Sequence, residues 1–447
     1  MKLLMKGVPQ LEALLSPKKA ESGCYRPSVY NYIYKQDQCC YLFNTLSRRL
    51  AQITPEEEAA LRCQQVEEIT PQLEALVAQR FLVKNDTDEA SHYMQIYSLL
   101  DIWAKREDKG FSVYEILTTT GCNARCFYCY EAGTKVSHMS AETADAAVDF
   151  IRKTRHPEKQ LRLDWFGGEP LLNTSVIDRI CSQLTREGIP FRSTLVTNGL
   201  LWNRELVQKA REGWLLDRVQ ITLDGFGEEH NRRKAYPGIA ADPFEKTVDN
   251  IGLLLDAGIR VMVRLNMDPN NIESIHQVYG YLKNRFSGSP GLLFDPSLLE
   301  EKWFQWDAQR SDQQQALLRQ QWKTLREQAE SDGFLRAKPL KSKLRRHHCM
   351  ANSPSSVTIL PDGTLSLCQT GNPEMYYGNI WQGVTKPELL TKWQDNSHLR
   401  PGCRDCIWLP DCTAFSLCPA KSSDCAQKQE DNFLQKLRVT LKNLSNC

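Results

Sequence analysis

Residues 114–133 read YEILTTTGCNARCFYCYEAG, in which an apolar, β-branched run is followed directly by three cysteines. The run ends at Gly121, and its composition predicts a buried strand. Cys122, Cys126 and Cys129 come next. We therefore expect a strand that leads into a loop bearing three thiols, around which the rest of the chain is organised.

Three closely spaced thiols limit the kinds of site that this loop can form. Cysteines this close cannot all be paired as disulfides, and a structural zinc site would need a fourth ligand from elsewhere in the chain. An iron–sulfur cube with one open iron needs only three thiolates from the protein, and its open iron can take a chelating ligand. The spacing favours the iron–sulfur cube, with structural zinc as the alternative.

The spacing C-x3-C-x-aromatic-C, in which Tyr128 is the aromatic residue, resembles the signature of the radical S-adenosylmethionine (SAM) superfamily. The resemblance implies that Cys122, Cys126 and Cys129 hold a 4Fe-4S cluster and that SAM binds its open iron. It also implies that the reduced cluster cleaves SAM to methionine and a 5′-deoxyadenosyl radical, which the protein aims at one substrate C–H bond.

Composition describes an ordinary globular protein of 447 residues, with 41% hydrophobic and 25% charged residues. The formal net charge of +2 gives no reason to expect a nucleic-acid partner. Polar residues and a proline interrupt the opening MKLLMKGVPQLEALL too often for a signal peptide, and no run of about 18 apolar residues predicts a membrane span. We expect a cytoplasmic enzyme, in which 16 cysteines indicate metal binding rather than disulfides.

Strands and helices alternate between residues 111 and 300. The predicted strands are residues 112–118, 161–166, 193–197, 219–223, 261–266 and 292–294. Amphipathic helices are predicted between them, for example at residues 141–153 and 244–257. This alternation predicts an α/β fold with a parallel sheet curled into a partial (β/α)6 TIM barrel, whose functional residues follow the C-terminal ends of the strands.

Gly167, Gly168, Glu169 and Pro170 follow the second predicted strand. Paired glycines let the backbone approach a ligand closely, and a neighbouring carboxylate can hold an ammonium group. In the radical SAM superfamily this GGEP element holds the amino group of the SAM methionine. The resemblance implies the same contact here; the alternative is that these four residues form a common turn without binding a ligand.

Polar residues also end the later predicted strands, where they would converge on the barrel mouth. By resemblance, Thr197, Asn198 and Thr222 line the ribose and sulfonium of SAM, and an arginine meets its carboxylate. The residues assigned to cofactor binding at these positions are Thr197, Asn198, Thr222, Arg233 and Arg264. Arg232 is the alternative to Arg233, because the family pattern H-D-x-x-R matches this segment only loosely.

Residues 1–110 predict a small α+β domain. Two β-rich runs between residues 28 and 47 are separated by residues 36–38, which predicts a hairpin. Thr-Pro pairs at residues 54–55 and 70–71 each predict the start of a helix. The arrangement resembles the winged-helix leader-binding element of peptide-modifying enzymes, whose strand edge can pair with an extended peptide. A purely structural extension is the alternative.

After a bridging helical segment at residues 301–345, residues 346–447 are rich in cysteine. The pattern C-x13-G-x4-C runs from Cys349 to Cys368, and C-x2-C-x5-C begins at Cys403. Together they closely resemble the SPASM extension of radical SAM enzymes, which holds two auxiliary 4Fe-4S clusters. Two zinc ions are the alternative, because C-x2-C pairs are ordinary zinc ligands.

The resemblance also implies which cysteines share a cluster. The outer cluster would take Cys403, Cys406, Cys412 and Cys425, and the inner cluster would take Cys349, Cys368 and Cys418. Five residues separate Cys412 from Cys418 where three are usual, and no further cysteine lies shortly before Cys349. We therefore expect an open iron in the inner cluster, or a ligand from His347 or His348.

SPASM proteins mostly modify peptides or proteins. We therefore expect an enzyme with three 4Fe-4S clusters and SAM, which matures a ribosomally made precursor peptide with a leader and takes electrons from flavodoxin or ferredoxin. A thioether from a peptide cysteine is the expected product, since an open iron can bind the substrate thiolate; carbon–carbon cross-linking and epimerisation remain open.

Two alternatives to this function remain. Sulfatase maturases, which form formylglycine, keep an aspartate where this chain has Gln369, so that alternative lacks its general base. The alternative from another class is a non-catalytic, metal-bound scaffold that binds a peptide.

Overall fold

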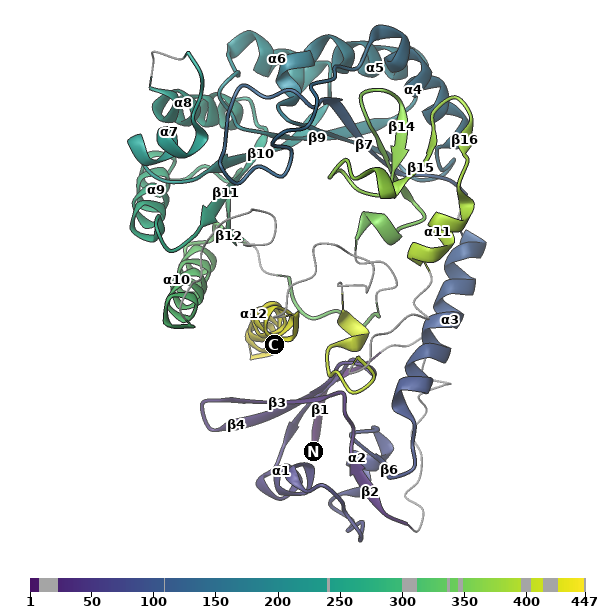
Figure 1. Ribbon diagram of the computed structural model, residues 1–447. Coiled ribbons are helices and arrows are strands. Elements are labelled where there is room, and N and C mark those ends of the chain that lie inside the picture. Colours follow the sequence, from purple (N-terminus) through teal and green to yellow (C-terminus); the bar gives the residue numbers. More distant parts are fainter. Residues whose placement is uncertain are drawn as a thin grey trace. The chain divides into compact units, whose positions relative to one another are not determined.

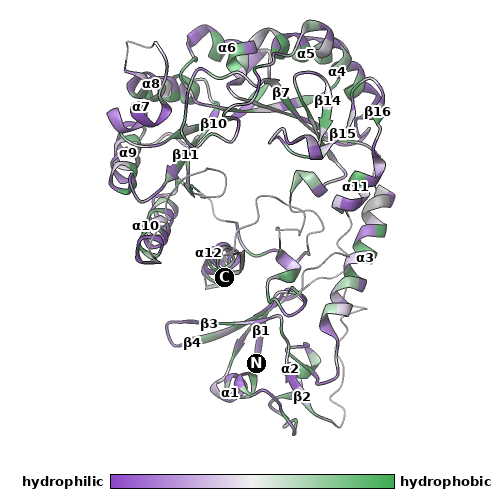
Figure 2. Ribbon diagram, in the orientation of Figure 1, coloured by the Kyte–Doolittle hydropathy of each residue, from purple (hydrophilic) through white to green (hydrophobic). Residues whose placement is uncertain are grey.

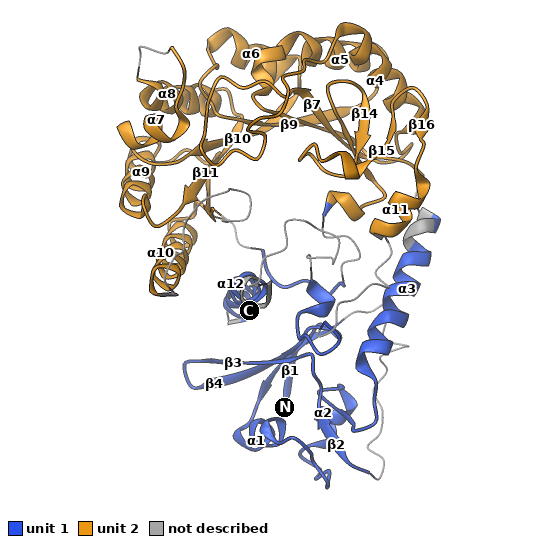
Figure 3. Cartoon of the chain, in the orientation of Figure 1, with its two compact units in different colours: residues 1–107, 337–349, 395–447 blue, residues 108–336, 350–394 orange. Residues whose placement is uncertain are grey.

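The computed structural model describes residues 1–7, 23–107, 109–238, 242–299, 312–335, 338–344, 349–394, 403–412 and 425–445. The chain divides into two compact units (Figure 3). Unit 1 comprises Met1–Glu107, Ala337–Cys349 and Asp395–Cys447, and unit 2 comprises Asp108–Arg336 and Met350–Gln394. The domain boundaries expected at residues 110, 300 and 345 stay a prediction.

Unit 2 is built on a ten-stranded sheet (Figure 1). The strand order is β12-β11-β10-β9-β8-β7-β13-β14-β15-β16, and the pairs from β12 to β13 are parallel. Its first six strands along the chain are β7 (Val113–Thr119), β8 (Leu161–Gly167), β9 (Phe191–Thr197), β10 (Leu216–Leu223), β11 (Arg260–Met267) and β12 (Leu292–Leu298). The six strands predicted from the sequence are therefore confirmed, and they form a partial barrel-like parallel sheet.

Helices cover one face of these strands (Figure 1). They are α4 (Ala141–Thr154), α5 (Thr174–Arg186), α6 (Arg204–Glu212), α7 (Glu228–Lys234), α8 (Pro243–Asp256) and α9 (Ile272–Arg285). The predicted helices at residues 141–153 and 244–257 correspond to α4 and α8 to within one residue. Both apolar and polar segments occur along α4, α5 and α6, as expected for helices with one buried side (Figure 2).

The alternation of side chains along β7 and β8 separates an apolar face from a polar one. Tyr114 contacts Phe150 of α4 edge-on, with ring centroids 6.4 Å apart, so this side of the sheet faces the helices. Residues of the opposite face are partly exposed and polar, for example Arg162 and Asp164 of β8 and Thr194 of β9. The polar face is therefore the one available to a ligand.

Residues 350–394 extend the same sheet. β13 (Ser356–Ile359) pairs in parallel with β7, and β14 (Thr364–Ser366), β15 (Tyr376–Asn379) and β16 (Gly383–Val384) follow antiparallel. The predicted turn between two short strands is confirmed: Gly363 has a φ of +83°, and the Asp362 carboxylate accepts a hydrogen bond from the Thr364 amide at 3.0 Å. The short helix α11 (Pro387–Gln394) ends this segment.

The predicted polar helix near residues 312–330 is α10 (Asp312–Ser331), which packs on β12 within unit 2. Trp322 donates its indole N–H to the Pro296 carbonyl at 2.8 Å, and Leu325 is fully buried. Leu318 is buried as well, so two of the three leucines belong to the core as expected, whereas Leu317 is exposed. That the helix bridges two domains stays a prediction.

Unit 1 contains a four-stranded antiparallel sheet of order β1-β5-β4-β3. Its elements are β1 (Lys2–Lys6), β2 (Tyr25–Pro27), β3 (Asn31–Gln36), β4 (Cys39–Asn44), β5 (Arg49–Ile53), β6 (Leu82–Lys84), α1 (Pro55–Arg62), α2 (Glu74–Ala78), α3 (Glu89–Glu107) and α12 (Cys425–Ser445). The predicted hairpin is β3–β4. Thr54 caps α1 with a capping box to Glu57, which confirms the first predicted helix start.

The second predicted helix start, at Thr70-Pro71, is wrong. Residues 71–73 form a turn, and α2 begins only at Glu74 with no side-chain cap. The Thr70 carbonyl accepts hydrogen bonds from the amides of Leu73 and Glu74, so the backbone of Thr70 closes the turn and its side chain does not cap the helix.

No helix in the described part of the chain is both long and apolar enough to cross a lipid bilayer.

The C-terminal segments of unit 1 pack on its N-terminal sheet. Three aromatic rings form a cluster with centroids 5.0–5.4 Å apart: Tyr32 of β3, Phe433 of α12, and Trp408 of the 403–412 segment. The guanidinium of Arg48 pairs with the Asp411 carboxylate at 2.5 Å. The 403–412 cysteine segment is therefore anchored on residues near the N-terminus.

Candidate cofactor and substrate site

The first cysteine of the three-cysteine loop comes three residues after the last residue of β7. Cys122, Cys126 and Cys129 are partly buried, and none of them is in a disulfide. The Cys129 amide donates to the Cys126 carbonyl at 3.1 Å, which closes a turn, and the Arg125 amide donates to the Lys234 carbonyl at 2.8 Å. The loop is thus tied at its middle to the end of α7.

The GGEP segment lies directly against this loop. The amides of Gly168 and Glu169 donate to the carbonyls of Thr119 and Gly121 at 3.0 and 2.9 Å. A Cβ on Gly168 would come within 2.5 Å of the Gly121 carbonyl oxygen, and one on Gly167 within 2.1 Å of the Thr119 carbonyl oxygen. Both positions therefore require glycine, because the two backbones touch where β7 and β8 end.

Glu169 is fully buried and its carboxylate is surrounded by donors. It accepts hydrogen bonds from the Thr197 hydroxyl at 2.8 and 2.9 Å, from the Asn198 amide at 2.8 Å and from the Leu171 amide at 3.1 Å. Burial raises the pKa of Glu169 to about 7, against the effect of these hydrogen bonds. An ammonium group placed beside Glu169 would favour its ionised form.

Three predicted cofactor residues, Glu169, Thr197 and Asn198, therefore meet in one place. The Asn198 side chain also donates to the Asn123 side-chain oxygen at 2.7 Å, which links them to the cysteine loop. The Asn123 side-chain nitrogen is buried without a hydrogen-bond partner within the described chain. Pro170, the last GGEP residue, has its carbonyl bonded to the Thr118 hydroxyl at 3.1 Å.

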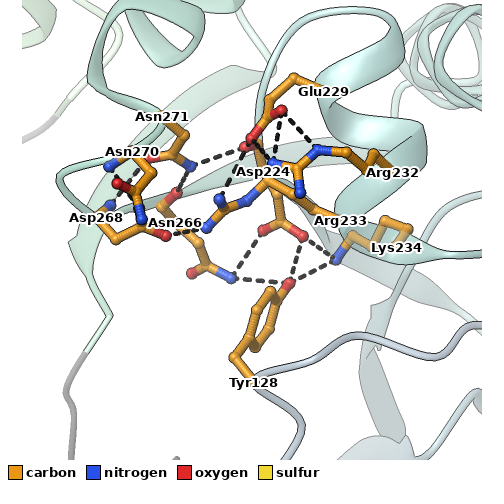
Figure 4. Close-up of polar contacts among 10 residues, drawn as sticks. All are labelled: Tyr128, Asp224, Glu229, Arg232, Arg233, Lys234, Asn266, Asp268, Asn270 and Asn271. Atoms are coloured by element: carbon orange, nitrogen blue, oxygen red, sulfur yellow. Dashed lines mark hydrogen bonds and ion pairs between the residues drawn. The ribbon is translucent and has the colours of Figure 1, made fainter. Parts of the chain in front are cut away.

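Tyr128, the aromatic residue of the signature, belongs to a buried polar network (Figure 4). Its hydroxyl donates to Asp224 at 2.5 Å and accepts from Lys234 at 2.9 Å and from the Asn266 side chain at 3.2 Å. Lys234 also pairs with Asp224 at 3.1 Å. The network fixes the loop between Cys126 and Cys129 to β10, β11 and α7.

Lys234 was not anticipated from the sequence. Burial alone would lower the pKa of Lys234, but the charges of Asp224 and Cys126 raise it above its usual value. Conversely, burial raises the pKa of the Cys126 thiol and the charge of Lys234 opposes that rise. The only hint in the sequence is that Lys234 ends the basic run that contains Arg232 and Arg233.

Arg233, predicted to meet the SAM carboxylate, is also buried. Its guanidinium pairs with Asp268 and with Glu229 (Figure 4). It also stands 4.9 Å from the ring centroid of Phe127. Arg232, the alternative, is exposed and pairs with Glu229 on its own helix. In this arrangement neither arginine is aimed at the Glu169 carboxylate, and the role of Arg233 stays a prediction.

The other two predicted cofactor residues lie side by side across β10 and β11. Thr222 is in register with Arg264, and both are partly exposed on the polar face of the sheet. Arg264 donates to the Asn266 side chain at 3.1 Å and lies 3.8 Å from the Asp295 carboxylate. They are therefore separate from the hydrogen bonds around Glu169.

The predicted auxiliary ligands are distributed over both units. Cys368 follows β14 in unit 2, whereas Cys349, Cys403, Cys406 and Cys412 belong to unit 1. Successive turns bring the amides of Cys406 and Cys412 onto the carbonyls of Cys403 and Leu409 at 3.2 Å each. Cys418, His347, His348 and the side chain of Cys425 lie outside the described residues.

These residues fit an iron–sulfur cluster with SAM. The loop offers three thiols as metal donors, which is the donor set such clusters use, and the orphaned Asn123 nitrogen and buried Glu169 provide polar groups for a ligand beside it. Within the described residues, no three His, Cys, Asp or Glu side chains are already grouped to hold a single metal ion.

Comparison with known proteins supports this assignment. The sequence matches the Radical SAM superfamily over residues 116–282. A probable GTP 3′,8-cyclase of Methanococcus maripaludis (strain C6) is 31% identical over 112 residues, which are 25% of this chain. The chain spans only 36% of the length of that relative.

Two solved structures share the fold. Native anSMEcpe with bound AdoMet has a TM-score of 0.56 and 17% identity, covering 75% of this chain and 99% of that one. Streptococcus suis SuiB bound to S-adenosylmethionine has a TM-score of 0.55 and 12% identity, covering 90% of this chain and 99% of that one. SuiB has also been solved with its precursor peptide SuiA. Residues 116–282 thus form a radical SAM domain.

Proposed function

We propose that this enzyme modifies a ribosomally synthesised precursor peptide by joining a cysteine sulfur of the peptide to a carbon of another residue. The observation that carries the proposal is the direct packing of the three-thiol loop on Gly168 and Glu169. A thiolate loop beside a buried acid suits a cluster whose open iron is chelated by an amino acid cofactor. The bound cluster would supply the electron that cleaves SAM.

The residues around Glu169 would bind and orient SAM. An entering ammonium lowers the pKa of Glu169 from about 7 and so stabilises the carboxylate that holds it. Thr197 and Asn198 already fix the direction of that carboxylate, so little reorganisation is needed on binding. Thr222, Arg233 and Arg264 are proposed further contacts to SAM.

The second group of cysteines would hold two auxiliary 4Fe-4S clusters. In this proposal the outer cluster takes Cys403, Cys406, Cys412 and Cys425, and the inner cluster takes Cys349, Cys368 and Cys418. The partly buried turns from Cys403 to Cys412, with two cysteine amides in hydrogen bonds, support the first set. The inner cluster, with an open iron, would bind the thiolate of the substrate.

The proposed substrate is a peptide with a leader. The likeness of fold to SuiB, which has been solved with a precursor peptide, supports this class. In unit 1, β3 is an edge strand of its sheet, and an extended leader could pair with such an edge. A flavodoxin or ferredoxin is the proposed reductant in the cytoplasm.

Formation of formylglycine on a sulfatase is the second proposal, because the fold also resembles anSMEcpe. That reaction needs a base at position 369. With its amide nitrogen facing Glu115, Gln369 donates to that carboxylate and cannot itself accept a proton. The thioether reaction is therefore favoured.

The test is anaerobic co-expression with a short cysteine-bearing peptide encoded nearby, followed by intact mass and tandem fragmentation. We expect the loss of two hydrogens per cross-link and protection of the peptide cysteines from alkylation. A variant with Cys122, Cys126 and Cys129 all changed to Ala should leave the peptide unmodified.

Other outcomes select the alternatives. If 5′-deoxyadenosine forms while every peptide cysteine still alkylates, the thioether proposal is wrong; a hydrazide-reactive aldehyde would then indicate formylglycine. If reconstituted protein releases no 5′-deoxyadenosine with any reductant, the chain is a non-catalytic scaffold.

A further inference from the structure

Glu115 is an acid in the middle of β7, seven residues before the first cysteine of the SAM loop. Its neighbours Tyr114 and Ile116 are fully buried, and Tyr114 contacts α4 through Phe150. Because side chains alternate along a strand, Glu115 points to the opposite, polar face of the sheet. It is only 6% exposed there.

The carboxylate of Glu115 is held by donors from the 350–394 segment. The Thr358 hydroxyl of β13 donates to it at 3.1 Å. With its amide nitrogen facing Glu115, Gln369 donates at 2.7 Å to one carboxylate oxygen and at 3.1 Å to the other. Both partners are neutral, so these bonds orient Glu115 without supplying a charge that would lock it in the ionised state.

The charged groups around Glu115 are on the neighbouring strand and in the cysteine loop. On β8, in register with Glu115, Asp164 already accepts hydrogen bonds from Arg162 at 2.7 and 3.0 Å. Burial raises the pKa of Glu115 to about 8; the bond from Thr358 and the charge of Arg162 lower it, and the charge of Asp164 raises it. A general base works best with a pKa near the working pH.

Glu115 is also close to both cysteine segments of unit 2. The charges of Glu131, Glu115, Cys129 and Cys368 all raise the pKa of Tyr130, after the larger effect of burial. Gln369, which contacts Glu115, is the residue directly after Cys368. A peptide held between these segments would therefore have Glu115 within reach, directly or through one water.

We propose that Glu115 is the catalytic proton acceptor for bond formation on the peptide. This inference rests on the proposed function. The peptide first loses a hydrogen atom from carbon to the 5′-deoxyadenosyl radical. The carbon radical would then bond to the sulfur of the cysteine thiolate and pass one electron to an oxidised iron–sulfur acceptor; the thiol proton would already have gone to the Glu115 carboxylate when the cysteine bound the open iron. The peptide thus loses two hydrogens in total.

The experiment compares Glu115→Gln with the wild type, using a peptide deuterated at the acceptor carbon. Glu115→Gln should still transfer deuterium into 5′-deoxyadenosine within about threefold of the wild-type rate, because hydrogen abstraction from carbon does not require the proton transfer. Thioether formation should fall about 100-fold or more, the usual contribution of a general base. Asp164→Asn, one strand away, is the matched control and should stay within about threefold on both measurements.

The pH dependence gives a second readout. Wild-type thioether formation should rise with pH through about 8, because the carboxylate is the reactive form, and this rise should be absent in Glu115→Gln. In metal-free protein, infrared difference spectra should show a carboxylic acid band that disappears with a midpoint near 8 in the wild type and is absent in Glu115→Gln. Glu115→Asp should restore part of the activity, since it keeps the acid.

Several outcomes would overturn the inference. Thioether formation unchanged in Glu115→Gln, or equal loss of deuterium transfer and product in a folded variant, excludes a role in bond formation. If Glu115→Gln does not fold, the wild type alone still tests the inference. Absence of the carboxylic acid band, together with thioether formation that does not rise with pH, would then exclude Glu115 as the proton acceptor. Failure of the proposed function is distinguishable, because it would appear as absence of peptide modification by the wild type itself.

Discussion

Replacement of Lys234 by Met tests whether the buried network around Tyr128 holds the cysteine loop in place. Lys234 is 3% exposed and its partner Asp224 is fully buried, with 3.1 Å between the ammonium nitrogen and the carboxylate oxygen. Lys234→Met keeps the length of the side chain but leaves Asp224 as an uncompensated buried charge. Removing one partner of a buried ion pair costs about 3–5 kcal/mol of unfolding free energy.

The assay is thermal and urea unfolding of the metal-free protein, followed by circular dichroism. At about 2–4 °C per kcal/mol, the melting temperature should fall by about 6–20 °C. Lys209→Met is the matched control: Lys209 is exposed and pairs with Asp178 at 3.2 Å, so its loss should cost under about 1 kcal/mol. The double variant Lys234→Met, Asp224→Asn should recover part of the loss, because no buried charge remains.

The pH dependence of Lys234→Met has a definite sign. In the wild type, burial raises the pKa of Asp224, but the charges of Lys234, His230 and Arg233 and the hydrogen bond from Tyr128 together outweigh burial, so the pKa lies below its usual value. Without Lys234 the burial effect dominates and the pKa rises above the unfolded value. An acid with a raised pKa in the folded state loses stability as pH rises, so the variant should be less destabilised at pH 5 than at pH 8. A cost under about 1 kcal/mol, or a double variant no more stable than the single one, would refute the reasoning.

Three further changes test the SAM site and unit 1. Glu169→Gln should weaken SAM binding, measured by equilibrium dialysis, by about 10–100-fold, because a hydrogen bond to a charged group contributes about 1.5–3 kcal/mol. Binding of SAM to the wild type should tighten as pH rises through about 7, and an affinity independent of pH would contradict this. Gly168→Ala should lower the iron content after reconstitution, since its Cβ would meet the Gly121 carbonyl at 2.5 Å, whereas Gly280→Ala, which meets nothing within 4 Å, should load normally. Arg48→Ala breaks the largely buried ion pair with Asp411, so it should destabilise unit 1 by about 3–5 kcal/mol and speed alkylation of the cysteines in residues 403–412. An unchanged alkylation rate would show that the Arg48–Asp411 pair does not hold that segment.

Local patterns made much of the radical SAM domain predictable. Each strand from β7 to β12 is a short segment with apolar side chains at alternate or consecutive positions, and Thr54 with Glu57 forms a cap within four residues of sequence. These patterns depend only on residues that are close in the sequence, so the strands and the helix cap can be predicted without knowing the fold. The Thr-Pro pair at Thr70 failed for the same reason, because a turn and a helix start share that local chemistry.

The sequence by itself determined the three-thiol loop, the GGEP element and the order of strands that brings Glu169, Thr197 and Asn198 to one edge of the sheet. Only the tertiary structure decided the pairing of β13 with β7, more than 200 residues apart, and with it the contact between Glu115 and Gln369. It also decided that Lys234 is buried against Asp224 and Tyr128 rather than solvated with its basic neighbours. The physical reason is that the state of a buried charge depends on the partner that the fold brings to it, and no spacing along the chain encodes that partner.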